Sequence, residues 1–368
     1  MTRPILVVAG EASGDRAAAA VIARMHSTRF FGYGGELCRN AGAQLLDNAS
    51  GRAAMGIVAV LPNVRRLAHL RAKILTETEH RQARVALLVN FSEFNATLLE
   101  PLRKLGVKTV FYGPPQVWAW RPRRARVIAR KATHVAAMLP FEEPLWRRAG
   151  ASVTYVGHPS AASFALSQTG EAQRCTDLCA LLPGSRDAEV RRNLPLMLEA
   201  AKLLSASGLR FRAYLATSLS KQVRAQALQS LHHAYISVED VNDATPLAAR
   251  LHSATVAIAV SGTATLECAL AGVPMVVVYR TGQVLATAAK YLLHTEHIAL
   301  PNILLKRRAF PELVGAAFSA SDVRRCVQSL VARIDDARAD CMHVALSLRT
   351  QFLADYAVAE ILNRLESA

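Results

Sequence analysis

Short apolar runs rich in Val, Ile and Leu alternate with helical stretches along the whole chain. In the first half, these runs predict strands at 4–9, 30–35, 85–89, 108–112, 134–141 and 153–159. In the second half, they predict strands at 179–183, 211–216, 235–238, 254–260 and 274–280. Because strands that alternate with helices pair in parallel, the pattern predicts an α/β protein with two parallel-sheet domains.

A change in composition around 160–174, to small and polar residues, suggests a linker between the two domains. With 368 residues the chain is long enough for both. We therefore expect an N-terminal domain at 1–164, a C-terminal domain at 175–340 and a helical tail at 341–368. The apolar run at 55–61 fits a strand or a buried helix equally well.

A tight turn of small residues at 261–267 is the first candidate for a ligand site. It follows a predicted strand and precedes a helix expected from Cys268. Backbone N–H groups and the positive end of a helix dipole converge at such a turn, which suits a phosphate. Ser261 and Thr263 add hydroxyl donors, and Glu267 lies one helical turn further on, within reach of a sugar hydroxyl. The alternative is an ordinary strand–helix turn without a ligand.

Three segments in the first half also follow predicted strands, where parallel sheets place ligands. Residues 10–15 form a glycine-containing turn before a helix expected from Arg16, without the G-x-G-x-x-G of a dinucleotide site. Residues 90–95 are mostly polar. The loop at 113–121 carries two tryptophans and leads into an arginine-rich helix, so it could clasp an amphiphile with an anionic head. The alternative packs the indoles in the core and leaves the arginines on the surface.

The positive charge is concentrated in the first half of the chain. Of the net charge of +16, residues 1–160 contribute +13, from 23 Lys and Arg against 10 Asp and Glu. An anionic membrane surface is the partner we expect. Nucleic acid is disfavoured because few aromatic residues accompany the basic ones and no nucleic-acid-binding motif is present.

Cysteine usage and hydropathy indicate the cellular compartment of the protein. The 6 cysteines are scattered, which favours reduced cytoplasmic thiols over disulfides or a zinc site. No stretch approaches the roughly 20 uninterrupted apolar residues of a membrane span. The N-terminal residues lack a secretory cleavage pattern, so we expect a cytoplasmic protein.

A series of short motifs resembles the lipid-A-disaccharide synthase family, which consists of inverting glycosyltransferases of the GT-B fold. The motifs are GEASGD at 10–15, MGIV at 55–58, PQVWAWR at 115–121, LPFE at 139–142, VGHP at 156–159, LPGSR at 182–186, SGTATLE at 261–267, LPNIL at 300–304 and PEL at 311–313. The resemblance implies two Rossmann-like parallel-sheet domains that face each other across a cleft. It also implies transfer of 2,3-diacylglucosamine from UDP-2,3-diacylglucosamine to 2,3-diacylglucosamine 1-phosphate, which releases UDP and forms the β-1,6 disaccharide of lipid A.

The resemblance also assigns residues to the two substrates. In the second domain it implies UDP-sugar contacts by Ser185, Arg186, Glu267 and Asn302. The turn at Ser261, Gly262 and Thr263, identified above from its own residues, would add contacts to the diphosphate. In the first domain it implies acceptor and lipid contacts by Glu11, Trp118, Trp120 and Arg121. It implies no cofactor and no metal, and the chain has no acidic D-x-D motif to hold one. We expect a peripheral protein on the cytoplasmic side of the inner membrane, and the apolar tail would suit a homodimer.

The sequence departs from the family pattern at the segment expected to carry the general base. Asn90 stands where the family has the Asp that is the favoured base, and an amide cannot take up a proton. The second acid of the segment is retained as Glu93, and Ser92 replaces the usual proline. Ala59 and Gly315 stand where the family has Glu and Gln. The candidate catalytic residues are therefore Asn90, Glu93 and Glu11.

Two other functions remain compatible with these departures. A paralogue of the same fold would use a UDP-sugar on a different acceptor. A non-catalytic protein would bind lipid or UDP-sugar after losing the base.

Overall fold

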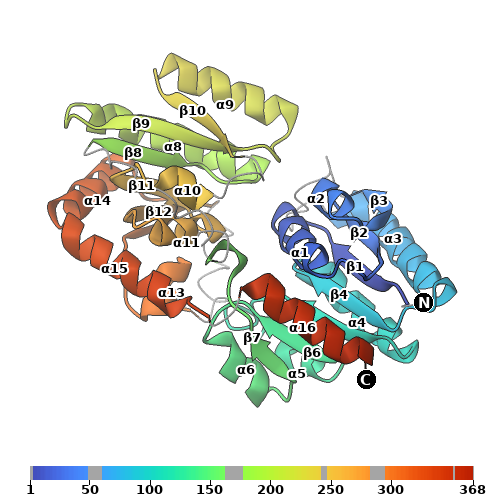
Figure 1. Cartoon of the computed structure of the whole chain (residues 1–368). Coiled ribbons are helices and arrows are strands. Elements are labelled where there is room, and N and C mark those ends of the chain that lie inside the picture. The colour runs from blue at the N-terminus through green and yellow to red at the C-terminus, as the bar shows by residue number, and fades with distance from the viewer. Residues whose placement is uncertain are drawn as a thin grey trace. The chain divides into compact units, whose positions relative to one another are not determined.

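The computed structural model describes residues 3–48, 60–161, 177–241, 247–281, 295–350 and 353–367 (Figure 1). The chain divides into two compact units. The first contains Met1–Pro159 and Thr350–Ala368, and the second contains Ser160–Arg349. Among the described residues, no helix is both long and apolar enough to span a membrane.

The first unit is built on a seven-stranded parallel sheet with the order β3-β2-β1-β4-β5-β6-β7. Its strands are β1 (Ile5–Ala9), β2 (Phe30–Gly34), β3 (Gln44–Asn48), β4 (Val85–Val89), β5 (Lys108–Tyr112), β6 (His134–Ala137) and β7 (Val153–Tyr155). Its helices are α1 (Ala12–Arg24), α2 (Glu36–Asn40), α3 (Val60–His80), α4 (Ser92–Lys104), α5 (Arg124–Ala129), α6 (Glu142–Arg148) and α16 (Ala354–Ser367).

Both faces of this sheet are buried, which explains why its central strands are apolar at every position. Along β1, Ile5 and Val7 pack in the cluster that includes α1 and α16. Leu6 and Val8, which point to the opposite face, pack in the cluster that includes α3 and α4.

The second unit is built on a six-stranded parallel sheet with the order β10-β9-β8-β11-β12-β13. Its strands are β8 (Leu178–Leu182), β9 (Arg210–Ala216), β10 (Ser237–Val241), β11 (Val256–Val260), β12 (Met275–Arg280) and β13 (Glu312–Gly315). Its helices are α8 (Asp187–Ser205), α9 (Lys221–His233), α10 (Leu247–Leu251), α11 (Thr263–Leu270), α13 (Leu300–Leu305), α14 (Ala320–Ala332) and α15 (Ile334–Ser347). The two parallel sheets confirm the fold class predicted from the apolar runs.

Two helices begin earlier than the sequence predicted. The N-terminal helix begins at Ala12 rather than Arg16, because the backbone N–H of Asp15 already donates to the carbonyl of Glu11 at 2.8 Å. Likewise α11 begins at Thr263 rather than Cys268. In both places, small residues that indicate a turn in the sequence form the first turn of a helix.

The C-terminal region is divided between the two units. The helix α15 ends at Ser347 within the second unit, whereas α16 lies against α1, β4 and β5 of the first unit (Figure 1). Residues 341–368 therefore do not form one separate tail. Most of the expected linker, together with residues 55–59 of the ambiguous apolar run, lies outside the described residues.

Candidate functional site

Each sheet has one point where its strand order reverses direction. In the first unit the chain moves outward from β1 to β3 and then resumes on the other side of β1 with β4. In the second unit the same reversal occurs between β8 and β11. Loops at the carboxyl ends of such neighbouring strands leave a crevice, and open α/β sheets bind ligands there.

A left-handed elbow follows β4 in the first unit. Asn90 (φ 46°) and Phe91 (φ 43°) both have left-handed backbone conformations before α4 begins. The Asn90 amide Nδ2 donates to Ser13 Oγ at 3.2 Å, which joins the elbow to the first turn of α1. Fully buried Asn95 supports the elbow from below, because its Nδ2 donates to the Asn90 carbonyl at 2.9 Å.

Glycines allow two neighbouring loops to close on this elbow. A Cβ atom on Gly10, after β1, would lie 2.3 Å from the Phe91 ring. A Cβ atom on Gly113, after β5, would lie 2.1 Å from Asn90 Oδ1, and Gly113 itself has φ +68°. Only glycine fits at such distances, so the sequence brings three loops together around Asn90.

The two candidate carboxylates at this elbow differ in their surroundings. Glu93, in the first turn of α4, pairs with the guanidinium of Arg124, the first residue of α5. Glu11 precedes α1 in an extended conformation, is exposed and makes no side-chain capping bond to its helix. The Glu93 carboxylate is therefore paired with a guanidinium, whereas the Glu11 side chain faces solvent.

The aromatic loop between β5 and α5 holds its tryptophans in partly exposed positions, so neither indole is a core residue. The Trp118 indole Nε1 donates to Glu142 Oε1 at 3.0 Å, and its ring meets Phe141 edge-on at 5.2 Å between centroids. The Arg121 guanidinium lies over the Trp120 ring, 4.5 Å from its centroid. Indole surface and cationic groups therefore occur side by side in this loop.

Three ionisable groups, in α6, in β7 and just after β7, have pKa values shifted by burial. Glu142 is 3% exposed, and burial raises the pKa of its carboxyl group although the hydrogen bonds from Trp118 and two backbone N–H groups oppose the rise. Burial also raises the pKa of Tyr155 to about 12, with a further contribution from Glu142. Burial lowers the pKa of His158 from 6.5 to about 4, so this imidazole is neutral near pH 7.

The loop after β8 in the second unit is organised by one carboxylate. Glu189 Oε2 accepts hydrogen bonds from the backbone N–H groups of Ser185 (3.1 Å) and Arg186 (3.3 Å). Its Oε1 accepts from Arg186 Nη1 at 2.9 Å, and the Arg186 side chain is 51% exposed. Gly184 (φ +114°) permits this arrangement, because a Cβ atom there would lie 2.6 Å from Glu189 Cβ. The guanidinium is thus held at the start of α8 with much of its surface open to solvent.

The turn after β11 lies beside that loop at the strand-order reversal. Ser261 Oγ donates to the Ile298 carbonyl at 2.9 Å, while Gly262 and Thr263 are exposed at the start of α11. Among the described residues, no atom lies within 4 Å of the position that a Gly262 Cβ would occupy. Glu267 is 8% exposed, and its Oε1 accepts from Ser160 Oγ at 3.2 Å. A helix N-terminus with exposed residues suits a phosphate, and the binding of one at this turn stays a prediction.

Asn302 lies inside the second unit rather than on its surface. Its Nδ2 donates to the Phe310 carbonyl and to Glu312 Oε1, both at 2.8 Å, and its Oδ1 accepts from the Phe310 N–H at 2.9 Å. Glu312 also accepts from the N–H groups of Ile298 and Ala299. This network fixes the segment at Ile298, whose carbonyl accepts the hydrogen bond from Ser261 Oγ. Asn302 therefore supports the turn from inside the unit.

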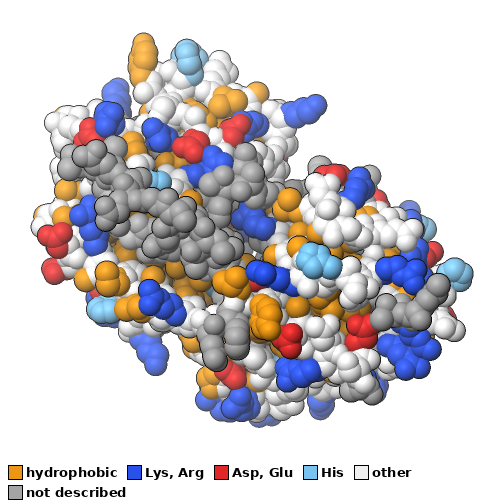
Figure 2. Space-filling model, in the orientation of Figure 1, with side chains coloured by type: hydrophobic (Ala, Val, Ile, Leu, Met, Phe, Trp, Pro, Cys, Tyr) orange, Lys and Arg blue, Asp and Glu red, His pale blue; other side chains and the backbone are white. Residues whose placement is uncertain are grey.

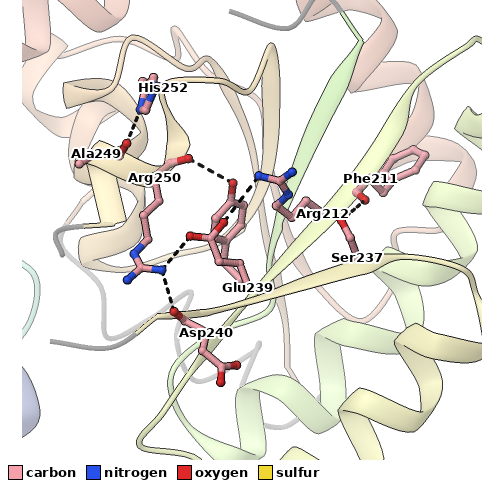
Figure 3. A network of polar contacts seen from close by, with 9 residues as sticks. Phe211, Arg212, Ser237, Glu239, Asp240, Ala249, Arg250 and His252 are labelled. Carbon is pink, nitrogen blue, oxygen red and sulfur yellow. Dashed lines mark hydrogen bonds and ion pairs between the residues drawn. The ribbon is translucent and has the colours of Figure 1, made fainter. Parts of the chain in front are cut away.

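A polar network at one edge of the second sheet has a different character. Glu239 of β10 accepts from Arg250 at 2.7 Å and lies 3.6 Å from Arg212 of β9 (Figure 3). Arg224 of α9 pairs with Asp240. These residues lie on β9, β10 and the neighbouring helices, away from the reversal between β8 and β11, and their charges are paired with one another. We assign this network to stabilising an edge strand.

Several residues of the site were missed at the level of sequence. Glu142 and Glu312 belong to short motifs noted above, but nothing in their spacing shows which atoms they contact. Glu189 is the third residue of α8, which is a position typical of capping carboxylates and could have indicated its role. Among the described residues, no group of three or more His, Cys, Asp or Glu side chains is arranged to hold a metal ion.

Comparison with known proteins identifies relatives along nearly the whole chain. Residues 5–352 match the family model described as lipid-A-disaccharide synthetase. The lipid-A-disaccharide synthase of Myxococcus xanthus is 38% identical over 344 residues, which cover 88% of this chain and 88% of that protein. The lipid-A-disaccharide synthase of Syntrophus aciditrophicus is 32% identical over 349 residues, which cover 91% of this chain and 90% of that protein.

Solved structures with the same fold are much more distant in sequence. MurG of Acinetobacter baumannii has a TM-score of 0.58 at 11% identity and covers 98% of this chain and 99% of its own. The S. aureus MnaA-UDP structure has a TM-score of 0.67 at 11% identity and covers 100% of this chain and 98% of its own. At this level of identity the likeness shows the fold alone, which is the GT-B fold with its two parallel-sheet α/β domains.

Proposed function

The chain belongs to the lipid-A-disaccharide synthase family and is a hexosyltransferase, and we propose the substrates and residue roles that follow. The donor is UDP-2,3-diacylglucosamine and the acceptor is 2,3-diacylglucosamine 1-phosphate. The products are UDP and the β-1,6 disaccharide of lipid A. The family match over residues 5–352 carries this proposal. The same match does not favour a paralogue with another acceptor or a non-catalytic binding protein.

We assign the UDP-sugar to the second unit. At the turn after β11, Gly262 and Thr263 are exposed and supply backbone N–H groups and the Thr263 hydroxyl for the departing diphosphate, because the Ser261 hydroxyl already donates to the Ile298 carbonyl. Arg186 supplies positive charge. Both loops follow neighbouring strands, β11 and β8, so they lie at the same crevice at the carboxyl ends of these strands. Glu267 would accept a hydrogen bond from a sugar or ribose hydroxyl.

We assign the acceptor to the first unit, around the Asn90 elbow. The Asn90 amide orients the acceptor hydroxyl, because an amide donates and accepts hydrogen bonds but takes up no proton. Glu11 is the general base we propose, since it is exposed and lies two residues from Ser13, which is bonded to Asn90. Glu93 is the weaker candidate because Arg124 already occupies its carboxylate. Trp118, Trp120 and Arg121 contact the acyl chains and the anionic group.

Product analysis tests the reaction itself. Purified protein is incubated with UDP-2,3-diacylglucosamine and 2,3-diacylglucosamine 1-phosphate, and lipids are separated by thin-layer chromatography. We expect a disaccharide and an equal amount of UDP. UDP release that requires some other acceptor would show the paralogue, and substrate binding without turnover would show a non-catalytic protein.

Four variants test the assignment of the base. Glu11→Gln should lower kcat by about 10²–10⁴-fold with UDP affinity unchanged, which is the usual contribution of a positioned acid or base. Glu93→Gln should cost less, and Glu79→Gln, an exposed control on α3, should cost nothing. A rise in kcat for Asn90→Asp, together with normal activity of Glu11→Gln, would show that a base acts at position 90. That result would refute the assignment of Glu11.

We propose that the first unit also docks on an anionic membrane, on the cytoplasmic face of the inner membrane. Exposed arginines follow one another from the aromatic loop along α5, at Arg121, Arg123, Arg126 and Arg130. Figure 2 shows one face of the protein, on which Lys and Arg side chains are spread among fewer acidic ones over the first unit. Such a surface binds anionic lipid through a field that salt screens.

Vesicle flotation tests this docking. Binding to vesicles with anionic lipid should weaken as salt is raised, and Arg126→Glu with Arg130→Glu should weaken it further. The same exchange at Arg191 and Arg192, exposed on α8 of the second unit, is the matched control. Equal binding to neutral vesicles would contradict an electrostatic contact.

We also propose a homodimer that covers apolar surface near the C-terminus. On α15, Met342 is 64% exposed and Leu346 is 47% exposed, one helical turn apart. Light scattering should give twice the mass of one chain, and Met342→Glu with Leu346→Glu should return it to one. A monomeric wild-type protein would refute this part.

A further inference from the structure

The aromatic loop at 113–121 is held by the segment that follows β6. At the start of the loop, Met138 packs where a Gly113 side chain would be, with its Cε 2.5 Å from the ideal Cβ position. At the middle of the loop, Phe141 and Glu142 contact Trp118. One short stretch, residues 138–142, therefore supports the loop at two separate points. No residue of this stretch is among those assigned above to the acceptor or to the base.

Glu142 is the centre of this support. Its Oε2 accepts hydrogen bonds from the backbone N–H groups of Met138 and Leu139, both at 3.1 Å. Its Oε1 accepts from the Trp118 indole at 3.0 Å. The side chain is 3% exposed, so a buried carboxylate faces N–H donors on both oxygens. A carboxylate is the group that satisfies such a ring of donors, because it accepts hydrogen bonds and donates none.

The bond to Glu142 decides which part of Trp118 is available to a ligand. The indole has a single N–H donor, and that donor is directed at Oε1. The edge-on contact with Phe141 fixes the tilt of the ring. What Trp118 can offer outside the protein is therefore apolar ring surface, which suits an acyl chain and not a sugar hydroxyl.

We propose that Glu142 is a positioning residue of the transferase, which holds Trp118 so that its ring surface contacts an acyl chain of the acceptor. This inference rests on the proposed function, in which the first unit binds the acylated acceptor. Glu142 does not touch substrate and acts through Trp118. It follows that Glu142 and Trp118 behave as one unit in acceptor binding.

Substitution by Gln is a sharp test because it preserves size but not hydrogen bonding. The new side-chain amide must point its NH₂ group at N–H donors on one side, so Glu142→Gln loses either the indole bond or the two backbone bonds. Trp118→Phe keeps an aromatic ring and removes only the indole donor and part of the surface. Glu143→Gln is the matched control, since Glu143 is the next residue and pairs with exposed Arg147.

Steady-state kinetics with varied acceptor give the first measurement. Glu142→Gln should raise the KM for the acceptor about tenfold or more, as expected for loss of a hydrogen bond to a charged group. The affinity for UDP should not change, and Glu143→Gln should behave as wild type. The double variant Glu142→Gln with Trp118→Phe should resemble the worse single variant, because both changes remove one shared interaction. Additive effects of the two changes, or an unchanged acceptor KM, would overturn the proposal.

Acrylamide quenching of fluorescence gives a second measurement that does not need catalysis. The difference between a protein and its Trp118→Phe counterpart isolates the emission of Trp118. In Glu142→Gln this emission should be quenched more strongly than in wild type, because the indole is released. Unchanged quenching would overturn the positioning role even if the enzyme is active. The two proposals can fail separately. If the wild-type protein makes no disaccharide while Glu142→Gln still shows stronger quenching of Trp118, the proposed function is refuted and the anchoring of Trp118 by Glu142 stands.

Discussion

Asp15 offers a direct test of how the first unit is held together. The side chain lies in the first turns of α1 and is 7% exposed. Its Oδ1 accepts hydrogen bonds from the N–H groups of Gly35 (2.7 Å) and Cys38 (3.2 Å), and its Oδ2 accepts from the N–H of Leu37 (3.1 Å). These donors lie at the start of α2, so one carboxylate joins the start of α1 to the start of α2. Gly35 must be glycine here, because a Cβ atom would lie 2.3 Å from Asp15 Oδ2.

The geometry predicts a graded loss of stability. Asp15→Ala leaves three backbone donors without their partner, and each buried unsatisfied donor costs about 1–3 kcal/mol. Because the donors share one carboxylate their costs overlap, and we expect a total of about 3–5 kcal/mol. Asp15→Asn keeps an oxygen at the Oδ1 position and turns its NH₂ toward Leu37, so only one bond is lost. We expect Asp15→Asn to cost about 1–2 kcal/mol.

The assay exploits the position of the tryptophans. All 3 of them, Trp118, Trp120 and Trp146, lie in the first unit. Urea denaturation followed by tryptophan fluorescence therefore reports the unfolding of that unit. Glu79→Ala, which removes an exposed carboxylate from α3, is the control and should change the free energy of unfolding by less than about 0.5 kcal/mol. An Asp15→Ala variant as stable as this control would refute the argument.

Three further predictions concern pH, the donor site and the elbow. His158 has a pKa of about 4 when folded and 6.5 as its ordinary value, so the unfolded chain binds a proton first as pH falls. The free energy of unfolding should then decrease by about 3 kcal/mol between pH 6.5 and 4, and His158→Gln should flatten this slope in urea titrations. Arg186→Ala should raise the Kd for UDP about tenfold or more in calorimetry, while Arg191→Ala on the same helix should not; equal affinities would remove Arg186 from the site. Gly113→Ala should destabilise the first unit by at least about 1 kcal/mol and slow disaccharide synthesis, because its Cβ would displace Asn90. Unchanged stability and an unchanged rate would contradict the close approach of Gly113 to Asn90.

The sequence alone was sufficient for the class of fold and for the positions of the polar loops that follow its central strands. Runs such as Val85–Val89 and Val256–Val260 are apolar at every position, as expected for strands buried on both faces. Polar and small residues that interrupt such runs must lie at strand ends. The loops at 90–95, 113–121 and 261–267 were therefore predictable. The edge strand β3 (QLLDN) was not, because its mixed polarity carries no period and its pairing with β2 alone defines it as a strand.

Only the tertiary structure decided which of the polar groups in those loops have partners. Glu93 and Arg124 are separated by 31 residues, and Trp118 and Glu142 by 24, so no local pattern relates them. Helix starts at Ala12 and Thr263 were likewise decided by backbone hydrogen bonds, which small residues permit but do not require. The order of the strands fixes which loops meet. The burial of each loop fixes which carboxylates already bond to groups of the protein itself. Spacing along the chain determines the elements, whereas the availability of a side chain for chemistry depends on neighbours that the fold brings from elsewhere in the sequence.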